Sequence, residues 1–276
     1  MEIEHSVARH YTHGSLEEAI LAALSASGKD LDHLTLEDLA PVDEFHVGGR
    51  QATIDLAAQL PFKPEDLVLD IGSGLGGASR YFAQIRQCRI IGIDLTEEYV
   101  RTATVLAQRT GLESLVSYKE GSALALPFEP GSFDGAYMLH VGMNIADKTR
   151  LFAEVHRVLK PGSCFAVYDV MRMGESDLIF PLPWAASPET SFVETPAHYR
   201  LWLEGAGFAI ETERSRRHFA IAFFREMRAR AGESGGPPPL GLHILMGASA
   251  PQKIANIIDN LERGLVAPTE IVARAL

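Results

Sequence analysis

The chain has 276 residues, of which 46% are hydrophobic and 22% charged; this composition is typical of a globular protein and excludes global disorder. A net charge of −11 disfavours non-specific nucleic-acid binding, because an acidic surface repels phosphate. The chain has only two cysteines, too few for a disulfide framework. No apolar run reaches the ~18 residues of a membrane span, and the N-terminal residues lack the features of a signal peptide. We therefore expect a cytoplasmic protein without nucleic-acid or membrane partners.

The first sixty residues are predicted to form a helical cap. Ser15 and Glu18 have the spacing of a capping box at the start of a helix over residues 15–27. A second short helix begins near Thr35, residues 41–49 form a loop, and a further helix runs to about Leu60. We assign residues 1–60 to this N-terminal helical cap.

Strands and helices alternate from residue 67 onward, which predicts an α/β domain. The near-continuous apolar strands between helices indicate a parallel sheet covered on both faces. The expected strands cover 67–71, 89–94, 115–119, 133–139, 163–171, 208–213 and 268–274. The expected helices cover 76–86, 97–110, 147–159, a segment from Thr195, 218–230 and 251–263, with a turn-forming stretch at 232–241. Residues 61–276 thus form one domain with a helical insertion at about 215–265.

The charge is concentrated in two segments. Residues 1–49 hold ten acidic and two basic residues, and so carry −8 of the net charge, whereas residues 214–230 hold six arginines and one glutamate. Two interpretations stay open: both segments are solvated helix faces, or the basic segment docks near the acidic one or contacts an anionic substrate. The ten histidines include no pair at metal-ligand spacing, so no metal site is predicted.

The strongest local signal is the sequence Val-Leu-Asp-Ile-Gly-Ser-Gly-Leu-Gly-Gly at residues 68–77, where a strand turns into a helix. Glycines 72, 74 and 76 permit a tight turn and close approach of the backbone to a ligand. Asp94 ends the next strand, a position where an acid can bind ribose hydroxyls. The loop is therefore a predicted nucleoside-binding site.

The same loop also fits the dinucleotide pattern through Gly72, Gly74 and Gly77, so an NAD(P)-dependent oxidoreductase is an alternative. Asp70 disfavours it, because a carboxylate beside the helix N-terminus repels a pyrophosphate. S-adenosylmethionine has no phosphate and carries a sulfonium and an ammonium, so Asp70 can hold its methionine end. The simpler interpretation is that Asp70 only caps backbone N–H groups of the loop.

Residues 68–77 resemble motif I of the class I S-adenosylmethionine-dependent methyltransferases, and further segments follow in the order of that family. They are 92–94, similar to the ribose-binding acid, 121–128, similar to the adenine edge, 133–134 at the fourth strand, and 157–162 at the turn into the fifth. The resemblance covers about residues 67–215. It implies a Rossmann-like, seven-stranded, mostly parallel sheet with an antiparallel last strand near 269–275.

The resemblance also implies the cofactor S-adenosyl-L-methionine and a set of residues that bind it. These are Asp70, Gly72, Ser73, Gly74, Gly76, Asp94, Leu95, Ser122, Ala123, Leu139 and Asn144. The family usually has Asp where this chain has Ser122, so adenine binding is expected to depend more on backbone amides. Because of this departure, a non-catalytic binding module is a second alternative.

Methyl transfer to a small-molecule acceptor is the predicted reaction, with the nucleophilic atom (N, C or O) left open. Residues 143–148 and 157–162 resemble quinone C-methyltransferases, whereas residues 45–53 look like sarcosine/dimethylglycine N-methyltransferases. His140, after the fourth strand, is the first candidate for a general base, and His46 and Tyr11 are candidate catalytic-site residues of a cap that folds over the site as a lid. Each has a packing role as its alternative, as do the aromatic residues Trp184, Phe192, Tyr199 and Trp202 that we consider for the substrate pocket. We expect a monomer or homodimer.

Overall fold

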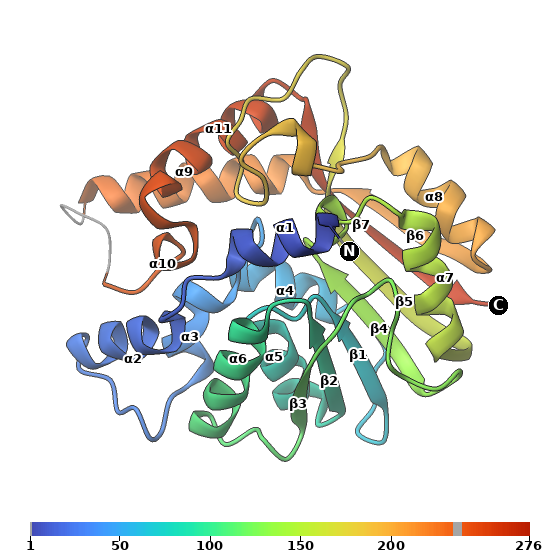
Figure 1. Cartoon of the computed structure of the whole chain (residues 1–276), viewed down its shortest axis with the longest axis horizontal. Helices are drawn as coiled ribbons and strands as arrows, with labels where there is room; N and C mark the ends of the chain where they lie inside the picture. Colours follow the sequence, from blue (N-terminus) through green and yellow to red (C-terminus); the bar gives the residue numbers. More distant parts are fainter. Residues whose placement is uncertain (1, 234–238) are drawn as a thin grey trace.

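The computed structural model describes residues 2–233 and 239–276, which are built around a seven-stranded sheet (Figure 1). The strand order is β3-β2-β1-β4-β5-β7-β6, and β7 runs antiparallel to both of its neighbours. The strands are β1 (Leu67–Ile71), β2 (Arg89–Asp94), β3 (Val116–Glu120), β4 (Phe133–Leu139), β5 (Leu159–Arg172), β6 (Phe208–Ser215) and β7 (Val266–Ala275). The predicted fold class, with its antiparallel last strand, is confirmed.

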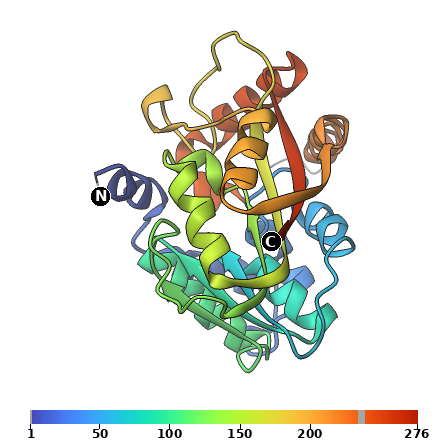
Figure 2. The ribbon, with the colours of Figure 1, turned by 90° about the vertical axis from the view of Figure 1, so that its right-hand side faces the viewer.

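Helices cover both faces of the sheet (Figure 2). Neighbouring residues of a strand point to opposite faces, so Val68 and Leu69 of β1 belong to different hydrophobic clusters. On one face lie α7 (Lys148–Val158) and α8 (Pro196–Gly205), and on the other α4 (Gly49–Ala57), α5 (Gly77–Arg86) and α6 (Glu97–Arg109). The continuous apolar strands are thus explained by burial on both sides.

The N-terminal segment contains a helix that the sequence did not suggest, α1 (Glu2–Tyr11), followed by α2 (Leu16–Ala26) and α3 (Leu36–Asp43). The predicted capping box of α2 is wrong, because the Ser15 side chain makes no cap. Instead the Glu98 carboxylate of α6 accepts from the backbone N–H of Leu16 at 2.9 Å and of His13 at 2.6 Å. A distant carboxylate has replaced the local cap.

The predicted loop over residues 41–49 is wrong for its first three residues, because α3 continues through Asp43 with Pro41 inside it. A capping box between Thr35 and Asp38 fixes the start of this helix, and Leu39 and Val42 are buried. Packing and capping therefore outweigh the helix-breaking tendency of proline.

The helical excursion between β6 and β7 consists of α9 (Arg217–Glu233), α10 (His243–Met246) and α11 (Ala250–Glu262). Of the predicted turn-forming stretch, residues 234–238 lie outside the described residues. Short 3-10 helices occupy Gly142–Asn144, Pro188–Thr190 and Gly247–Ser249. None of the helices in the described part of the chain has both the length and the apolarity needed to cross a membrane.

Two arginines at the start of the basic segment, the exposed Arg214 and the buried Arg216, pair with acids of other elements. Arg216 is 7% exposed and donates to Glu270 of β7 at 2.6 Å and to Asp55 of α4. Arg214 also donates to Glu270. Both acids lie outside residues 1–49, so the predicted docking of the basic segment near the acidic one is not supported, and Arg214 remains exposed as the solvated-face interpretation expects.

Candidate functional site

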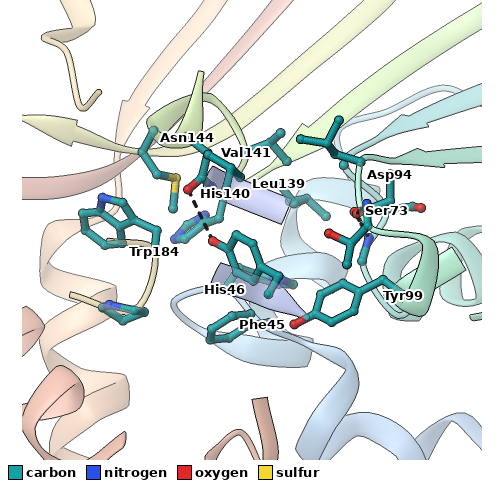
Figure 3. Close-up of a pocket in the computed structure, with 18 of the residues that line it drawn as sticks. Phe45, His46, Ser73, Asp94, Tyr99, Leu139, His140, Val141, Asn144 and Trp184 are labelled. Carbon is teal, nitrogen blue, oxygen red and sulfur yellow. Dashed lines mark hydrogen bonds between the residues drawn. The ribbon is translucent and has the colours of Figure 1, made fainter. Parts of the chain in front are cut away.

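A cavity of about 510 Å³ lies at the carboxyl ends of the parallel strands (Figure 3). It lies beside β1 and β4, where the strand order reverses: β1 connects to β2 on one side of the sheet, and β4 connects to β5 on the other. Ligands bind at such switch points in open α/β sheets. In Figure 3, Asp94, Ser73 and Tyr99 stand on one side, Trp184 on the other, and His46, His140 and Asn144 between them. The predicted catalytic candidates and all the predicted cofactor residues except Gly76 line this cavity.

Asp94 is held by backbone donors of the glycine loop. Its Oδ2 accepts from the N–H of Gly74 at 2.9 Å, and its Oδ1 accepts from the N–H of Thr96 at 2.9 Å. Burial raises the pKa of this carboxyl group. Each carboxylate oxygen has more than one acceptor site, so Asp94 can still accept from the hydroxyls of a ligand.

The glycines of the loop have different roles. A Cβ at Gly72, where φ is +70°, would lie 2.3 Å from Cγ2 of Val141, so only glycine permits the turn against the β4 loop. A Cβ at Gly76 would lie 2.1 Å from the Tyr118 hydroxyl oxygen. Gly76 is the N-cap of α5 and does not line the cavity, so the geometry assigns it to packing rather than to cofactor contact.

Asp70 is buried beside the cavity and is bonded by two side-chain hydroxyls. Its Oδ2 accepts from Ser79 at 2.5 Å and from Tyr137 at 3.0 Å. Burial is the largest cause that raises its pKa to about 7. These donors are side chains, so the interpretation of Asp70 as a cap of the loop backbone is not supported. A bound cation would favour the ionised carboxylate.

Two buried hydroxyls in the cavity wall have no hydrogen-bond partner within the described residues, Ser73 Oγ and Tyr99 Oη. Unpaired buried polar groups are costly, so a ligand with polar groups fits here. The wall also carries acidic side chains, and no Lys or Arg is among its described residues. The acids are Glu4, Asp43, Asp70, Asp94 and Asp147. This end of the cavity suits a cationic ligand that has hydroxyls, as S-adenosylmethionine does.

The other end of the cavity is an apolar chamber. Its wall comes largely from the excursion and from the segment after β5, and it includes Met143, Trp184, Phe223, Phe224, Met227, Leu245, Met246, Ile254 and Ile257. Of the four aromatic residues considered from sequence, only Trp184 is in this wall. Tyr199 lies in the core and donates to Asp169 at 2.7 Å. Sequence reasoning missed the excursion residues and Tyr99, although Tyr99 lies in the first turn of α6, the helix that follows Asp94.

His140 has both ring nitrogens engaged. Nδ1 lies 3.0 Å from the Tyr168 carbonyl oxygen, and Nε2 lies 3.2 Å from the backbone N–H of Val47. Nδ1 therefore carries the proton, and the lone pair of Nε2 accepts from Val47. Burial lowers the His140 pKa to about 3. This geometry argues against His140 as the base and gives it a role in joining the cap to the β4 loop.

His46 has a different arrangement. Its Nε2 lies 3.2 Å from the Gly49 carbonyl oxygen and 3.1 Å from Thr53 Oγ1. The Thr53 hydroxyl donates to Glu44 at 2.7 Å, so Nε2 carries the proton and Nδ1 holds the lone pair. Nδ1 has no hydrogen-bond partner in the described part of the chain, and His46 lines the cavity. Burial lowers the His46 pKa, whereas the charge of Glu44 raises it.

Tyr11 and Asn144 meet across the cavity, with the Tyr11 hydroxyl donating to Asn144 Oδ1 at 3.4 Å. Burial raises the Tyr11 pKa, so the phenol stays protonated at neutral pH. Tyr11 therefore anchors α1 over the cavity and acts there as a donor.

Comparison with known proteins agrees with this architecture. Residues 69–167 match the family described as "Methyltransferase domain". The chain aligns over its full length with a geranyl diphosphate methyltransferase solved with geranyl diphosphate and sinefungin, with a TM-score of 0.73 and 17% identity, covering 100% of each chain. A putative sarcosine dimethylglycine methyltransferase from Galdieria sulphuraria aligns with a TM-score of 0.64 and 18% identity over 81% of this chain and 82% of that one. The chain therefore has the fold of these methyltransferase structures, and residues 69–167 are similar to a methyltransferase domain.

Curated relatives match over less than half of the chain. Sterol 24-C-methyltransferase of Kluyveromyces lactis is 32% identical over 114 residues, which is 41% of this chain and 31% of the relative. Erythromycin 3''-O-methyltransferase of Saccharopolyspora erythraea is 36% identical over 129 residues, which is 45% of this chain and 42% of the relative. The chain thus spans less than half the length of these relatives.

Proposed function

We propose that the chain is an S-adenosylmethionine-dependent methyltransferase whose acceptor is a small, mostly apolar molecule. The observation that carries this proposal is that one cavity joins an acidic end, with two unpartnered hydroxyls, to an apolar chamber. The acidic end opposes a pyrophosphate, which disfavours the NAD(P)-dependent alternative. The apolar chamber favours an acceptor with apolar surface, because transfer of that surface out of water lowers the free energy of binding.

The cofactor supplies a methyl carbon bonded to a positively charged sulfur, which a lone pair of the acceptor displaces in line. Asp94 would accept from the ribose hydroxyls, and Asp70 would attract the cationic methionine end. Ser73 and the glycine loop would complete this end of the site. Because the carbon is already activated, positioning and exclusion of water are the main tasks of the protein.

His46 is the proposed general base where the acceptor atom carries a proton. The lone pair of Nδ1 takes the proton from the acceptor, while Nε2–H stays bonded to Gly49 and Thr53. The buried Glu44 carboxylate, whose Oε2 lies 3.5 Å from His46 Nε2, stabilises the imidazolium that forms. An acceptor without such a proton needs no base, so the atom (N, C or O) stays open.

The substrates named for the relatives, a sterol and erythromycin, are small molecules with large apolar parts, which agrees with an apolar chamber for the acceptor. We further propose a cap over residues 1–60 on a catalytic domain over 61–276, a monomeric or homodimeric state and a cytoplasmic location. The two free, buried cysteines, Cys88 and Cys164, support a reducing compartment.

Titration calorimetry tests the cofactor directly, with S-adenosylhomocysteine and NADH as ligands of the intact chain. We expect the adenosyl ligand to bind and NADH not to bind, and binding of NADH alone would refute the proposal. Acceptor screening then follows the release of S-adenosylhomocysteine. Trp184→Ala should lower kcat/KM for an apolar acceptor without changing the cofactor Kd. Trp202→Ala, outside the cavity wall, is the matched control.

A further inference from the structure

Ser122, in the loop after β3, is hydrogen-bonded to a residue near the start of the chain. Its hydroxyl donates to Oε1 of Glu4 in α1 and accepts from the backbone N–H of Leu124 at 3.0 Å. Both Glu4 and Ser122 line the cavity. The hydrogen bond from Ser122 fixes the Glu4 carboxylate at the β3 side of the cavity.

The Glu4 carboxylate lies on the β3 side of the cavity, which is the side toward which we expect the base of a bound nucleoside to point. β3 is the neighbour of β2, and the N–H of Gly121 donates to the Asp94 carbonyl oxygen at 2.9 Å, so Ser122 is close in space to Asp94. A ribose held by Asp94 has the glycine loop and Asp70 on its β1 side, which suit the cationic methionine end. The base is thereby directed to the β3 side, toward Ser122 and Glu4.

We propose that Glu4 recognises the adenine of the cofactor, so that α1 supplies the carboxylate that position 122 lacks; this rests on the proposed function. The exocyclic amine of adenine is a donor, and an ionised carboxylate offers about four acceptor sites. The bond from Ser122 uses one of them and orients the group. A charged acceptor binds an amine more strongly than a serine hydroxyl does.

The placement of Glu4 couples adenine recognition to closure of the site. The same helix is tied to Asn144 through Tyr11 and to the Pro183 carbonyl oxygen through His10 Nε2, at 3.1 Å. In Figure 1, α1 lies between the ends of the parallel strands and the helices α9 and α11. A purine bonded to Glu4 therefore holds the helix that covers both ends of the cavity.

The test compares S-adenosylhomocysteine with S-inosylhomocysteine, which has a 6-oxo acceptor in place of the amine, by titration calorimetry. We expect the wild-type chain to prefer the adenosyl ligand by about tenfold or more. Glu4→Gln should remove or reverse this preference, because its amide can donate to the 6-oxo group. His5→Ala, exposed on the same helix, should keep it.

A double variant checks that the carboxylate itself is responsible. Glu4→Ala with Ser122→Asp places an acid in the loop after β3 and should restore the adenosyl preference that Glu4→Ala alone loses. If the wild type binds neither ligand, the proposed function fails. The role of Glu4 is overturned if the wild type prefers the adenosyl ligand and Glu4→Gln keeps that preference. It is also overturned if His5→Ala loses as much of the preference as Glu4→Gln does.

Discussion

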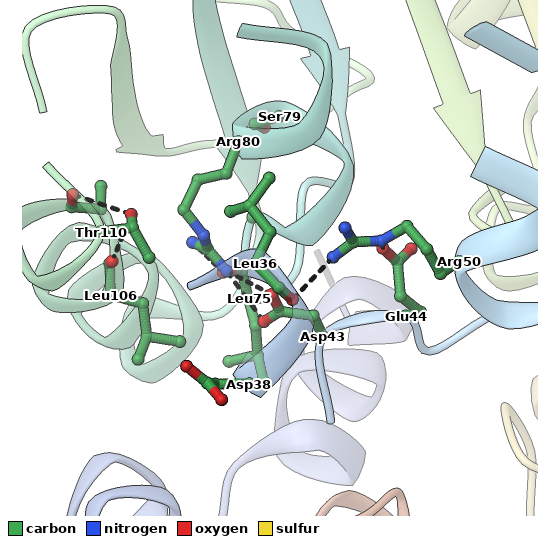
Figure 4. A network of polar contacts seen from close by, with 12 residues as sticks. Leu36, Asp38, Asp43, Glu44, Arg50, Leu75, Ser79, Arg80, Leu106 and Thr110 are labelled. Atoms are coloured by element: carbon green, nitrogen blue, oxygen red, sulfur yellow. Dashed lines mark hydrogen bonds and ion pairs between the residues drawn. The ribbon is translucent and has the colours of Figure 1, made fainter. Parts of the chain in front are cut away.

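Asp43 of α3 and Arg80 of α5 form an ion pair in which both side chains are fully buried (Figure 4). Both carboxylate oxygens lie 2.8 Å from the same Arg80 Nη2, and Arg80 Nη1 donates to the Leu75 carbonyl oxygen at 2.8 Å. Asp43 also lines the cavity. The pair therefore joins the cap to the glycine-loop helix at the wall of the site.

Asp43→Ala should destabilise the fold by about 3–5 kcal/mol, because it leaves the Arg80 charge buried without its partner. The free energy of unfolding in urea measures this loss. Asp43→Leu combined with Arg80→Met should recover most of it. Asp38→Ala, which breaks the more exposed pair with Lys29 and also removes a helix cap, should cost only about 1–2 kcal/mol. Equal losses in the two single variants would contradict burial as the cause.

Gly77→Ala tests the close approach of α3 to α5. An added Cβ would lie 2.6 Å from the Asp43 Cβ and 2.8 Å from its carbonyl oxygen, so one helix must move at a cost of about 1–3 kcal/mol. Gly205→Ala is the control, because nothing lies within 4 Å of its added Cβ. Thermal unfolding should show a lower Tm for the first variant only.

The parts of the site that sequence reasoning found are local in the chain. The glycine loop, Asp70 and Asp94 belong to one strand–helix–strand unit, so their relative positions follow from contiguous residues. Glu4 and Phe224 belong to segments that are distant from the glycine loop in the sequence and reach the cavity only through packing, for which no local pattern exists. The failed capping box has the same cause, since a carboxylate of α6 serves the start of α2. His140 was correctly placed at the sheet edge, but its bonds to Tyr168 and Val47 could not be read from its neighbours.

Asp94→Asn should raise the Kd of S-adenosylhomocysteine by about tenfold or more, through the loss of charge-assisted hydrogen bonds. The amide oxygen can still accept one of the two backbone bonds, so the variant should stay folded. Asp177→Asn, at an exposed position, is the control and should bind like the wild type. An unchanged Kd in Asp94→Asn would remove Asp94 from the cofactor site.

Asp70 should make the stability of the ligand-free protein fall as the pH rises. Its pKa is about 7 in the folded chain, against 3.8 for an aspartate carboxyl group exposed to water, so between these values the folded state binds more protons than the unfolded state. The favourable contribution of Asp70 to the free energy of unfolding is fully present below pH 3.8 and is lost as the pH rises through 7. Asp70→Asn should therefore gain stability relative to the wild type between about pH 4 and 8 in urea unfolding. A constant difference across this range would contradict the raised pKa.

His46→Ala should lower kcat for a hydroxyl acceptor by about 10²- to 10⁴-fold and leave the cofactor Kd unchanged. Because burial lowers the His46 pKa, the acidic limb of the wild-type pH–rate profile should lie at lower pH than the limb of an ordinary histidine base. Glu44→Gln removes the charge that raises this pKa, so the acidic limb should move to lower pH while kcat decreases. His33→Ala, which alters an exposed histidine, serves as the control. If His140→Ala abolishes turnover while His46→Ala retains it, the base is His140, and its bond to Val47 must open during the reaction.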